Sequence, residues 1–148
     1  MIKTCVFILL FVLCSCANQQ KQVQHPLNWE YNINTAIIKA EKSHKLVLLY
    51  FYGENCDWCE AMNASLNDKS IRKLLDKKFI LAWVDVEKSE LAKFVKIKTV
   101  PTVVVVYPNK NDDEIIGSEI GYLNIPEFKQ FLKQNIKKSN NLKGELHL

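Results

Sequence analysis

The sequence lacks internal repeats, and it lacks a stripe of basic and aromatic residues of the kind that binds nucleic acids. Its net charge of +4 comes from basic residues spread along the chain, with a denser patch from Lys129 to Lys143, which is typical of a solvated surface. We therefore expect no nucleic-acid partner. What remains is an ordinary globular composition, 48% hydrophobic and 24% charged, in 148 residues, a length that suits one domain.

Cysteine is scarce beyond the N-terminus: of five cysteines, only Cys56 and Cys59 lie outside the first sixteen residues. A structural zinc site needs four ligands, and the sequence provides neither a second C-x-x-C pair nor histidines near this one. We interpret His25 and His44 as a tether residue and the end of a surface helix. A disulfide that closes only four residues removes roughly 2 kcal/mol of chain entropy, so a structural staple is a weak explanation. Dithiol exchange is favoured, with Cu(I) bound by the two thiolates as the open alternative.

The N-terminus has the features of a secretory signal. Lys3 provides a positive charge, and Val6 to Leu13 form an apolar segment that is too short to span a bilayer as a helix. The segment ends in "LCSC", which resembles the lipobox of bacterial lipoproteins, where cleavage precedes a cysteine that is then lipidated, here Cys16. We expect a signal peptide over residues 1–15 and a polar tether over residues 16–26. Cleavage after Ala17, which would release a soluble periplasmic protein, is the alternative.

Removal of the signal would leave Cys56 and Cys59 as the two free thiols of the mature chain. We expect this chain at the periplasmic face of a bacterial membrane, anchored by lipid on Cys16. That compartment permits disulfides to form and persist.

The hydrophobic patterns predict alternating strands and helices. Strands are expected at residues 27–31, 46–52, 79–86, 101–108 and 114–120. Helices are expected from Asn34 or Thr35 to His44, from about Cys56 to Leu66, from Ser70 onward, over residues 89–97, and from Asn124 to Lys137, after which the polar tail is expected to fray. The run "LVLLYFY" at 46–52 is typical of a strand buried on both faces, and the aromatic residues expected in the core are Phe51, Tyr52, Phe79, Trp83 and Phe94.

The C-x-x-C pair follows this buried strand and opens a helix, a placement typical of thioredoxin-like redox motifs. Three stretches resemble the thioredoxin superfamily: "LVLLYFYGENCDWC" its strand and redox motif, "IKTVPT" its cis-proline loop, and "IGYLNIPEFKQFL" its final strand edge and helix. The resemblance covers residues 29–137 and implies an α/β thioredoxin fold, a central mixed β-sheet flanked by helices, over residues 27–138, with a polar tail at 139–148. The lead-in to the motif is similar to the periplasmic thioredoxin-like domain of transmembrane thiol-reductant transporters.

Each residue of the motif has an expected role. Cys56 is the expected nucleophile, because a helix N-terminus favours its thiolate, and Cys59, one turn deeper, is the expected resolving thiol. The resemblance implies that Pro101 follows a cis peptide bond and that Val100 offers its backbone to an extended substrate segment. Trp58 is expected to shield the disulfide or to widen the substrate-contact surface.

The chain departs from the family pattern behind the motif. The buried acid of thioredoxins corresponds to Tyr50 here, and its lysine partner corresponds to Trp83, so both members of the charged pair are replaced together. Proton transfer from Cys59 then needs another acceptor. Glu60, Tyr50 through a water molecule, and solvent are the candidates.

Three carboxylates, those of Glu54, Asp57 and Glu60, accompany the two cysteines. A carboxylate ~8 Å away opposes the Cys56 thiolate by about 0.5–2 kcal/mol. A less stabilised thiolate means a less stable reduced form, the opposite of a strong oxidant. We therefore predict a reductase or a mild isomerase.

The sequence as a whole predicts an extracytoplasmic thiol–disulfide oxidoreductase that uses Cys56 and Cys59 and needs no organic cofactor and no metal. Its expected partners are exported proteins with disulfides, a membrane thiol-reductant donor, and the membrane itself through Cys16. We expect a monomer. The alternative is a copper or zinc carrier that uses the same two thiols on the same fold.

Overall fold

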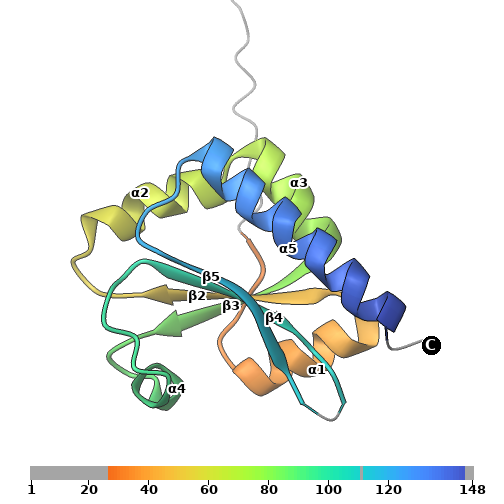
Figure 1. The fold of residues 1–148 in the computed structure, drawn as a ribbon. Helices are drawn as coiled ribbons and strands as arrows, with labels where there is room; N and C mark the ends of the chain where they lie inside the picture. Colours follow the sequence, from red (N-terminus) through yellow and green to blue (C-terminus); the bar gives the residue numbers. More distant parts are fainter. Residues whose placement is uncertain (1–26, 111, 146–148) are drawn as a thin grey trace, which may run out of the picture.

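Five strands form one sheet with helices on both faces in the computed structural model, which describes residues 27–110 and 112–145 (Figure 1). The strand order is β1-β3-β2-β4-β5; β1 and β2 run parallel to β3, and β4 runs antiparallel to β2 and β5. The strands are β1 (Trp29–Glu30), β2 (Leu46–Tyr52), β3 (Phe79–Asp85), β4 (Thr102–Tyr107) and β5 (Glu114–Ile120). The helices are α1 (Ile33–Ser43), α2 (Asp57–Leu66), α3 (Lys69–Lys78), α4 (Glu90–Phe94) and α5 (Ile125–Glu145).

This arrangement confirms the predicted α/β class and the mixed sheet. Helices α2, α3 and α5 cover one face of the sheet, and α1 and α4 lie on the other (Figure 1). Among the described residues, no helix is both long enough and apolar enough to cross a membrane. The predicted signal peptide, the tether and Cys16 lie outside the described residues.

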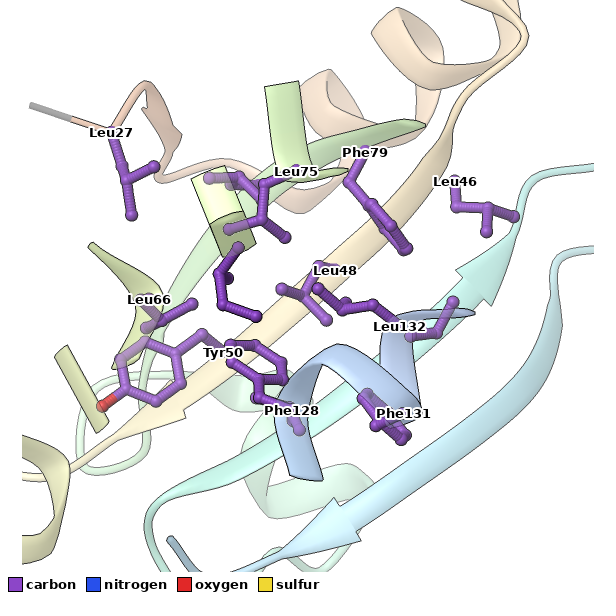
Figure 2. Packing of buried hydrophobic residues seen from close by; sticks show 14 of the residues in the cluster. Leu27, Leu46, Leu48, Tyr50, Leu66, Leu75, Phe79, Phe128, Phe131 and Leu132 are labelled. Carbon is purple, nitrogen blue, oxygen red and sulfur yellow. The ribbon is translucent and has the colours of Figure 1, made fainter. Parts of the chain in front are cut away.

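Strand β2 is buried on both faces, as the run "LVLLYFY" predicts. Leu48 and Tyr50 enter the cluster beneath α2, α3 and α5, part of which Figure 2 shows, whereas Val47, Leu49 and Phe51 enter the cluster beneath α1 and α4. Successive side chains of a strand point to opposite faces, so an unbroken apolar run supplies both clusters at once. This strand therefore sets the position of whatever follows its carboxyl end, which is the C-x-x-C motif.

Two helices begin earlier than predicted, because a residue upstream provides the cap. Asn32 caps α1 by accepting a hydrogen bond from the backbone N–H of Thr35 at 3.0 Å. Asp68 caps α3 by accepting hydrogen bonds from the N–H groups of Ser70 and Ile71, and it also accepts one from the Ser70 hydroxyl. These hydrogen bonds lower the pKa of Asp68, and the one from the Ser70 hydroxyl has the largest effect. Asn and Asp are both preferred N-cap residues, so each helix starts directly after Asn32 or Asp68.

Helix α5 continues to Glu145 and does not fray after Lys137. It begins at Ile125, directly after the predicted cap Asn124, whose side chain accepts from the N–H of Glu127 while Glu127 accepts from the N–H of Asn124. Beyond the predicted end, Ser139 is buried and Leu142 packs against the core. The tail was misjudged because its inward positions are partly polar; the Ser139 hydroxyl is satisfied by the carbonyl of Ile136 within the helix.

Phe94 is not a core residue, contrary to the prediction. Its side chain is 84% exposed, whereas the other four aromatic residues of that prediction lie in or against the two clusters. Helix α4 has only five residues, is capped by Ser89 and buries Ala92 alone. Phe94, two residues after Ala92, therefore lies on the other side of the helix.

Candidate active site

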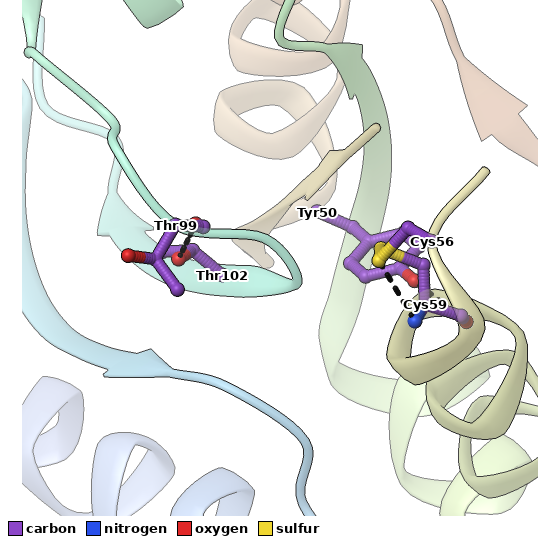
Figure 3. The surroundings of a disulfide bond; sticks show 5 residues. All are labelled: Tyr50, Cys56, Cys59, Thr99 and Thr102. Carbon is purple, nitrogen blue, oxygen red and sulfur yellow. Dashed lines mark hydrogen bonds between the residues drawn. A yellow bond between two sulfur atoms is a disulfide. The ribbon is translucent and has the colours of Figure 1, made fainter. Parts of the chain in front are cut away.

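The disulfide between Cys56 and Cys59 lies at the N-terminus of α2, directly after β2 and a short turn (Figure 3). Cys56 is the cap of this helix: its sulfur accepts a hydrogen bond from the N–H of Cys59 at 3.1 Å, and its carbonyl accepts from Cys59 and Glu60. Cys56 is partly exposed, and Cys59 is fully buried. The first N–H groups and the positive end of the dipole of α2 thus point at the sulfur that a second protein can reach.

The loop before β4 packs against the turn that leads into the motif. The peptide bond between Val100 and Pro101 is cis, as the resemblance implies. A Cβ atom on Gly53 would come within 3.0 Å of the Val100 side chain, so the glycine allows the two segments to approach closely. Thr102 donates its hydroxyl to the carbonyl of Thr99 at 2.6 Å across this loop, as Figure 3 shows. The candidate contact residues Val100 and Pro101 are thereby brought beside the C-x-x-C turn.

Trp58 extends from the motif toward a residue that the sequence reasoning missed. Its ring is 64% exposed and lies 5.7 Å from the ring of Tyr122, centroid to centroid. Tyr122 follows Gly121, which has a φ of +96° and donates its N–H to the carbonyl of Pro101 at 2.7 Å. This hydrogen bond ties the β5–α5 connection to the cis-proline loop. The signal was present in the sequence as the "IGY" before the last helix, but nothing there indicated the partner of Trp58.

Tyr50 reaches the motif from behind. Its hydroxyl donates to the carbonyl of Cys59 at 3.0 Å, and the side chain is completely buried. Burial, with a smaller contribution from Tyr52, raises the pKa of Tyr50 above its ordinary value. The phenol therefore keeps its proton and acts as a hydrogen-bond donor at this position. Its part in proton transfer, like that of the exposed Glu60, stays a prediction.

The pair that replaces the family's buried acid and lysine is a direct cross-strand contact. Tyr50 and Trp83 are register partners on β2 and β3, and their rings meet edge to face at 5.1 Å. Trp29 and Tyr52 complete the group, each within 5.2 Å of Trp83 between ring centroids. An aromatic cluster therefore fills the place of a buried ion pair, so no unpaired charge lies behind the disulfide.

One of the three carboxylates near the motif has a cation beside it. The ammonium group of Lys88 lies 3.1 Å from Glu54 and 2.9 Å from Asp85. Hydrogen bonding to Asp85, and then to Glu54, raises the pKa of Lys88, and the hydrogen bond from Lys88 is the largest cause of the lowered pKa of Asp85. The sequence reasoning counted Glu54 as an uncompensated charge. The structure shows that Lys88 offsets it, leaving Asp57 and Glu60 as the carboxylates to weigh.

No cluster of three or more His, Cys, Asp or Glu side chains suitable for a metal ion occurs in residues 27–110 and 112–145. Of the two histidines that the sequence reasoning weighed, His44 is the C-terminal cap of α1 with a φ of +54°, and His25 lies outside the described residues.

A model of a thioredoxin-like family, Thioredox_DsbH, described as "Protein of unknown function, DUF255", matches residues 14–102, more than half of the chain. The chain belongs to this thioredoxin-like family. A solved thioredoxin from Thermus thermophilus is 30% identical, with a TM-score of 0.71, and the match covers 78% of this chain and 91% of that one. No curated protein matches the sequence.

Two more distant structures share the fold. The disulphide isomerase of Xylella fastidiosa Temecula1 is 20% identical over 74% of this chain and 98% of that chain, with a TM-score of 0.55. The thioredoxin of Trichomonas vaginalis is 19% identical over 68% and 88%, also with a TM-score of 0.55. The thioredoxin fold and the resemblance read from the sequence are thus confirmed. Fold, family and the Cys56–Cys59 disulfide together identify a thiol–disulfide oxidoreductase in general terms.

Proposed function

We propose that this chain is an extracytoplasmic thiol–disulfide oxidoreductase that reduces or isomerises disulfides in exported proteins. The observation that carries the proposal is the contrast between its two cysteines on one helical turn. Cys56 is partly exposed at the N-terminus of α2, and Cys59 is buried behind it. An accessible nucleophile with a protected resolving thiol is the arrangement that disulfide exchange requires.

The exchange proceeds in two balanced steps. The Cys56 thiolate attacks one sulfur of a substrate disulfide, forming a mixed disulfide and releasing the other substrate sulfur as a thiolate. The Cys59 thiolate then attacks the Cys56 sulfur, which releases the second substrate thiolate and forms the Cys56–Cys59 disulfide. Two electrons pass to the substrate, and a dithiol donor must return two electrons to this protein. In isomerisation, a substrate thiol displaces Cys56 instead.

Two features support the reducing direction, and a third limits its strength. Asp57 and Glu60 belong to the first turn of α2, where their charges oppose the Cys56 thiolate. The Tyr50 hydroxyl donates to the Cys59 carbonyl and provides no positive charge to either sulfur. Because Lys88 compensates Glu54, the negative charge that opposes the Cys56 thiolate is smaller than three free carboxylates would give. We therefore expect a mildly reducing protein and not a strongly reducing one.

The proposed location follows from the N-terminal sequence. A lipid on Cys16 would hold the domain at the periplasmic face of a bacterial membrane, on a tether of about ten residues. A membrane thiol-reductant transporter is the proposed electron donor, because it would supply dithiols in that compartment. The mass of the mature protein tests the anchor: we expect acyl chains on Cys16, whereas an unmodified chain that begins at Asn18 would contradict it.

A Cys59→Ser variant tests the exchange. With the resolving thiol removed, mixed disulfides should accumulate on Cys56, visible as high-mass bands on non-reducing gels that disappear with dithiothreitol. Cys56→Ser is the matched control and should trap nothing. Absence of adducts, together with stoichiometric Cu(I) or Zn²⁺ binding by the reduced wild-type protein, would establish the carrier instead.

A further inference from the structure

The face of the sheet that carries α1 and α4 has a groove of about 680 Å3 beside the active-site loop. Its floor is formed by β2, β4 and β5, and its walls by α1 and by the segment that follows α4. Its lining includes Thr99, Thr102, Val104, Val106, Ile115 and Ile120. The groove exists because α4 has five residues and leaves β5 uncovered on this face.

The groove exposes apolar side chains that the fold does not need to bury. Ile115 and Ile120 are 59% and 71% exposed on β5, and Val95, directly after α4, is 37% exposed in the wall of the groove. On the same face, Val104 and Val106 are buried at the bottom. Exposed aliphatic side chains gathered around a hollow are typical of an interaction site. A flat lipid surface would touch the rim only, whereas a protruding aliphatic side chain can reach the floor.

The rim is positively charged on the side of α4. Lys96 and Lys98 line the groove, and within the described part of the chain no carboxylate lies within ion-pair distance of either. Lys93, on α4 itself, is paired with Glu90 at 2.6 Å. The one carboxylate in the lining, that of Asp113, accepts a hydrogen bond from the N–H of Asn109. The charge therefore favours an acidic occupant, and it disfavours a second copy that would bring the same lysines together.

The groove is continuous with the catalytic site. Thr99 and Thr102 line it and also bracket the Val100–Pro101 bond, and Val100 packs against Gly53 in the turn before Cys56. A substrate segment that pairs with this loop while its cysteine reacts with Cys56 would continue toward the groove. Proteins with unformed or wrongly formed disulfides are incompletely folded, and they expose the aliphatic segments that such a groove fits.

We propose that the groove binds aliphatic segments, flanked by acidic residues, of incompletely folded protein substrates. This inference rests on the proposed function for its meaning, because it names the substrate class of the same site. Binding itself, however, needs neither cysteine. The groove and the exchange chemistry can therefore be tested separately.

Binding is measured by fluorescence anisotropy with a labelled, cysteine-free peptide of isoleucine and valine flanked by glutamates. The protein is the Cys56→Ser, Cys59→Ser double variant, so disulfide chemistry plays no part. Ile115→Asp and Ile120→Asp, combined, should weaken binding at least tenfold. Ile38→Asp is the matched control, since Ile38 is an exposed isoleucine on α1 outside the groove, and it should change binding less than twofold.

Turnover gives the second readout. Wild-type protein should reduce a disulfide peptide that carries the acidic aliphatic segment with a kcat/KM at least tenfold above that for the same peptide without it. The groove variant should lose this preference and reduce a small aromatic disulfide at the normal rate. If exchange fails while the peptide binds, the proposed function is wrong, but the groove is still a binding site for acidic aliphatic segments.

Three results would overturn the groove proposal. The first is disulfide exchange at normal rates by a protein that neither binds the cysteine-free peptide nor prefers the disulfide peptide with the acidic aliphatic segment. The second is a loss of binding in Ile38→Asp equal to that in the groove variant. The third is groove-dependent retention on vesicles of phosphatidylglycerol, or groove-dependent dimerisation in sedimentation, with no affinity for the peptide.

Discussion

The two faces of the sheet are covered in different ways (Figure 1). Beneath α2, α3 and α5, large side chains such as Tyr50, Met62 and Phe128 are completely buried, as in the part shown in Figure 2. Beneath α1 and α4, the helices contribute small residues, with Ala36 and Ala40 on α1, and β5 stays open at Ile115 and Ile120. We call the first the packed face and the second the open face.

This difference separates two tasks that one small domain performs. The packed face holds α2 and its disulfide in place through Tyr50 and the helices above it. The open face carries exposed apolar side chains that fold stability does not need. Changes on the packed face should therefore alter stability, and changes on the open face should alter which substrates are used.

Truncation of one apolar side chain on each face gives the largest contrast. Phe128→Ala should lower the free energy of unfolding by about 3–5 kcal/mol, because the ring is fully buried and leaves a cavity. Ile120→Ala should change it by less than about 0.5 kcal/mol, because the side chain is already solvated. Urea denaturation followed by circular dichroism measures both. Similar losses in the two variants would remove the distinction between the faces.

A single added methyl group tests how tightly the packed face is filled. A Cβ atom on Gly117 in β5 would overlap the amide of the buried Asn135 in α5, whose Nδ2 donates to the carbonyl of Phe131 at 2.9 Å. Gly117→Ala should therefore cost about 1–3 kcal/mol of unfolding free energy. Gly144→Ala, with no atom within 4 Å of the added carbon, should be neutral or slightly stabilising.

The same contact predicts a rescue. Asn135→Ala removes the amide that the new methyl group would meet, so the double variant should be less destabilised than the sum of the two single variants. Thermal denaturation of the wild type, the two single variants and the double variant measures the coupling between positions 117 and 135. Simple additivity would show that the strand and the helix do not meet at this point.

Most of the packed face was predictable from the sequence. Its elements are long and strongly patterned: the run at 46–52, and the spacing of Phe128, Phe131 and Leu132 on α5. The site was also predictable where three motifs agreed, at the cysteines and at Pro101. Errors arose where polar residues occupy inward positions, as at Ser139, because hydrophobic periodicity does not register them.

The open face was the part that the sequence concealed. Phe94 fits a helical apolar pattern, but a helix of five residues has too few positions to define which face is buried.

Two contacts around the active site were also hidden in the sequence. The lysine that compensates Glu54 and the tyrosine beside Trp58 lie 34 and 64 residues away in the chain from their partners. Contacts of that kind depend on the tertiary fold and leave no local pattern.

A substitution at Tyr50 tests the connection between the packed face and the disulfide. Tyr50→Phe removes only the hydroxyl that donates to Cys59, so we expect a loss of about 0.5–1.5 kcal/mol in unfolding free energy of the oxidised protein. Tyr52→Phe is the control, because Tyr52 belongs to the same aromatic group but is partly exposed. An equal effect of both changes would mean that the hydroxyl contributes nothing specific to the motif.

The smallest expected effect concerns the charges that join the end of β3 to the active-site turn. Lys88 connects Asp85, at the end of β3, to Glu54, just before Cys56, and all three side chains are exposed or partly exposed. Exposed pairs of this kind contribute little at neutral pH and are screened by salt. Their signature is a dependence on pH that packing does not have.

The sign of that dependence follows from Asp85. Its pKa is lowered in the folded protein, so the stabilisation is present above its ordinary pKa and is lost as the pH falls through the lowered one. Lys88→Gln should reduce this acid-side loss, with a remainder from the backbone N–H groups of Glu87 and Lys88 that also lower the pKa of Asp85. Lys93→Gln, which breaks only the Glu90 pair within α4, should keep the full loss. Urea midpoints of the three proteins between neutral pH and about pH 2 measure the difference. If wild type and Lys88→Gln lose stability in parallel on acidification, the carboxylate of Asp85 is not coupled to Lys88.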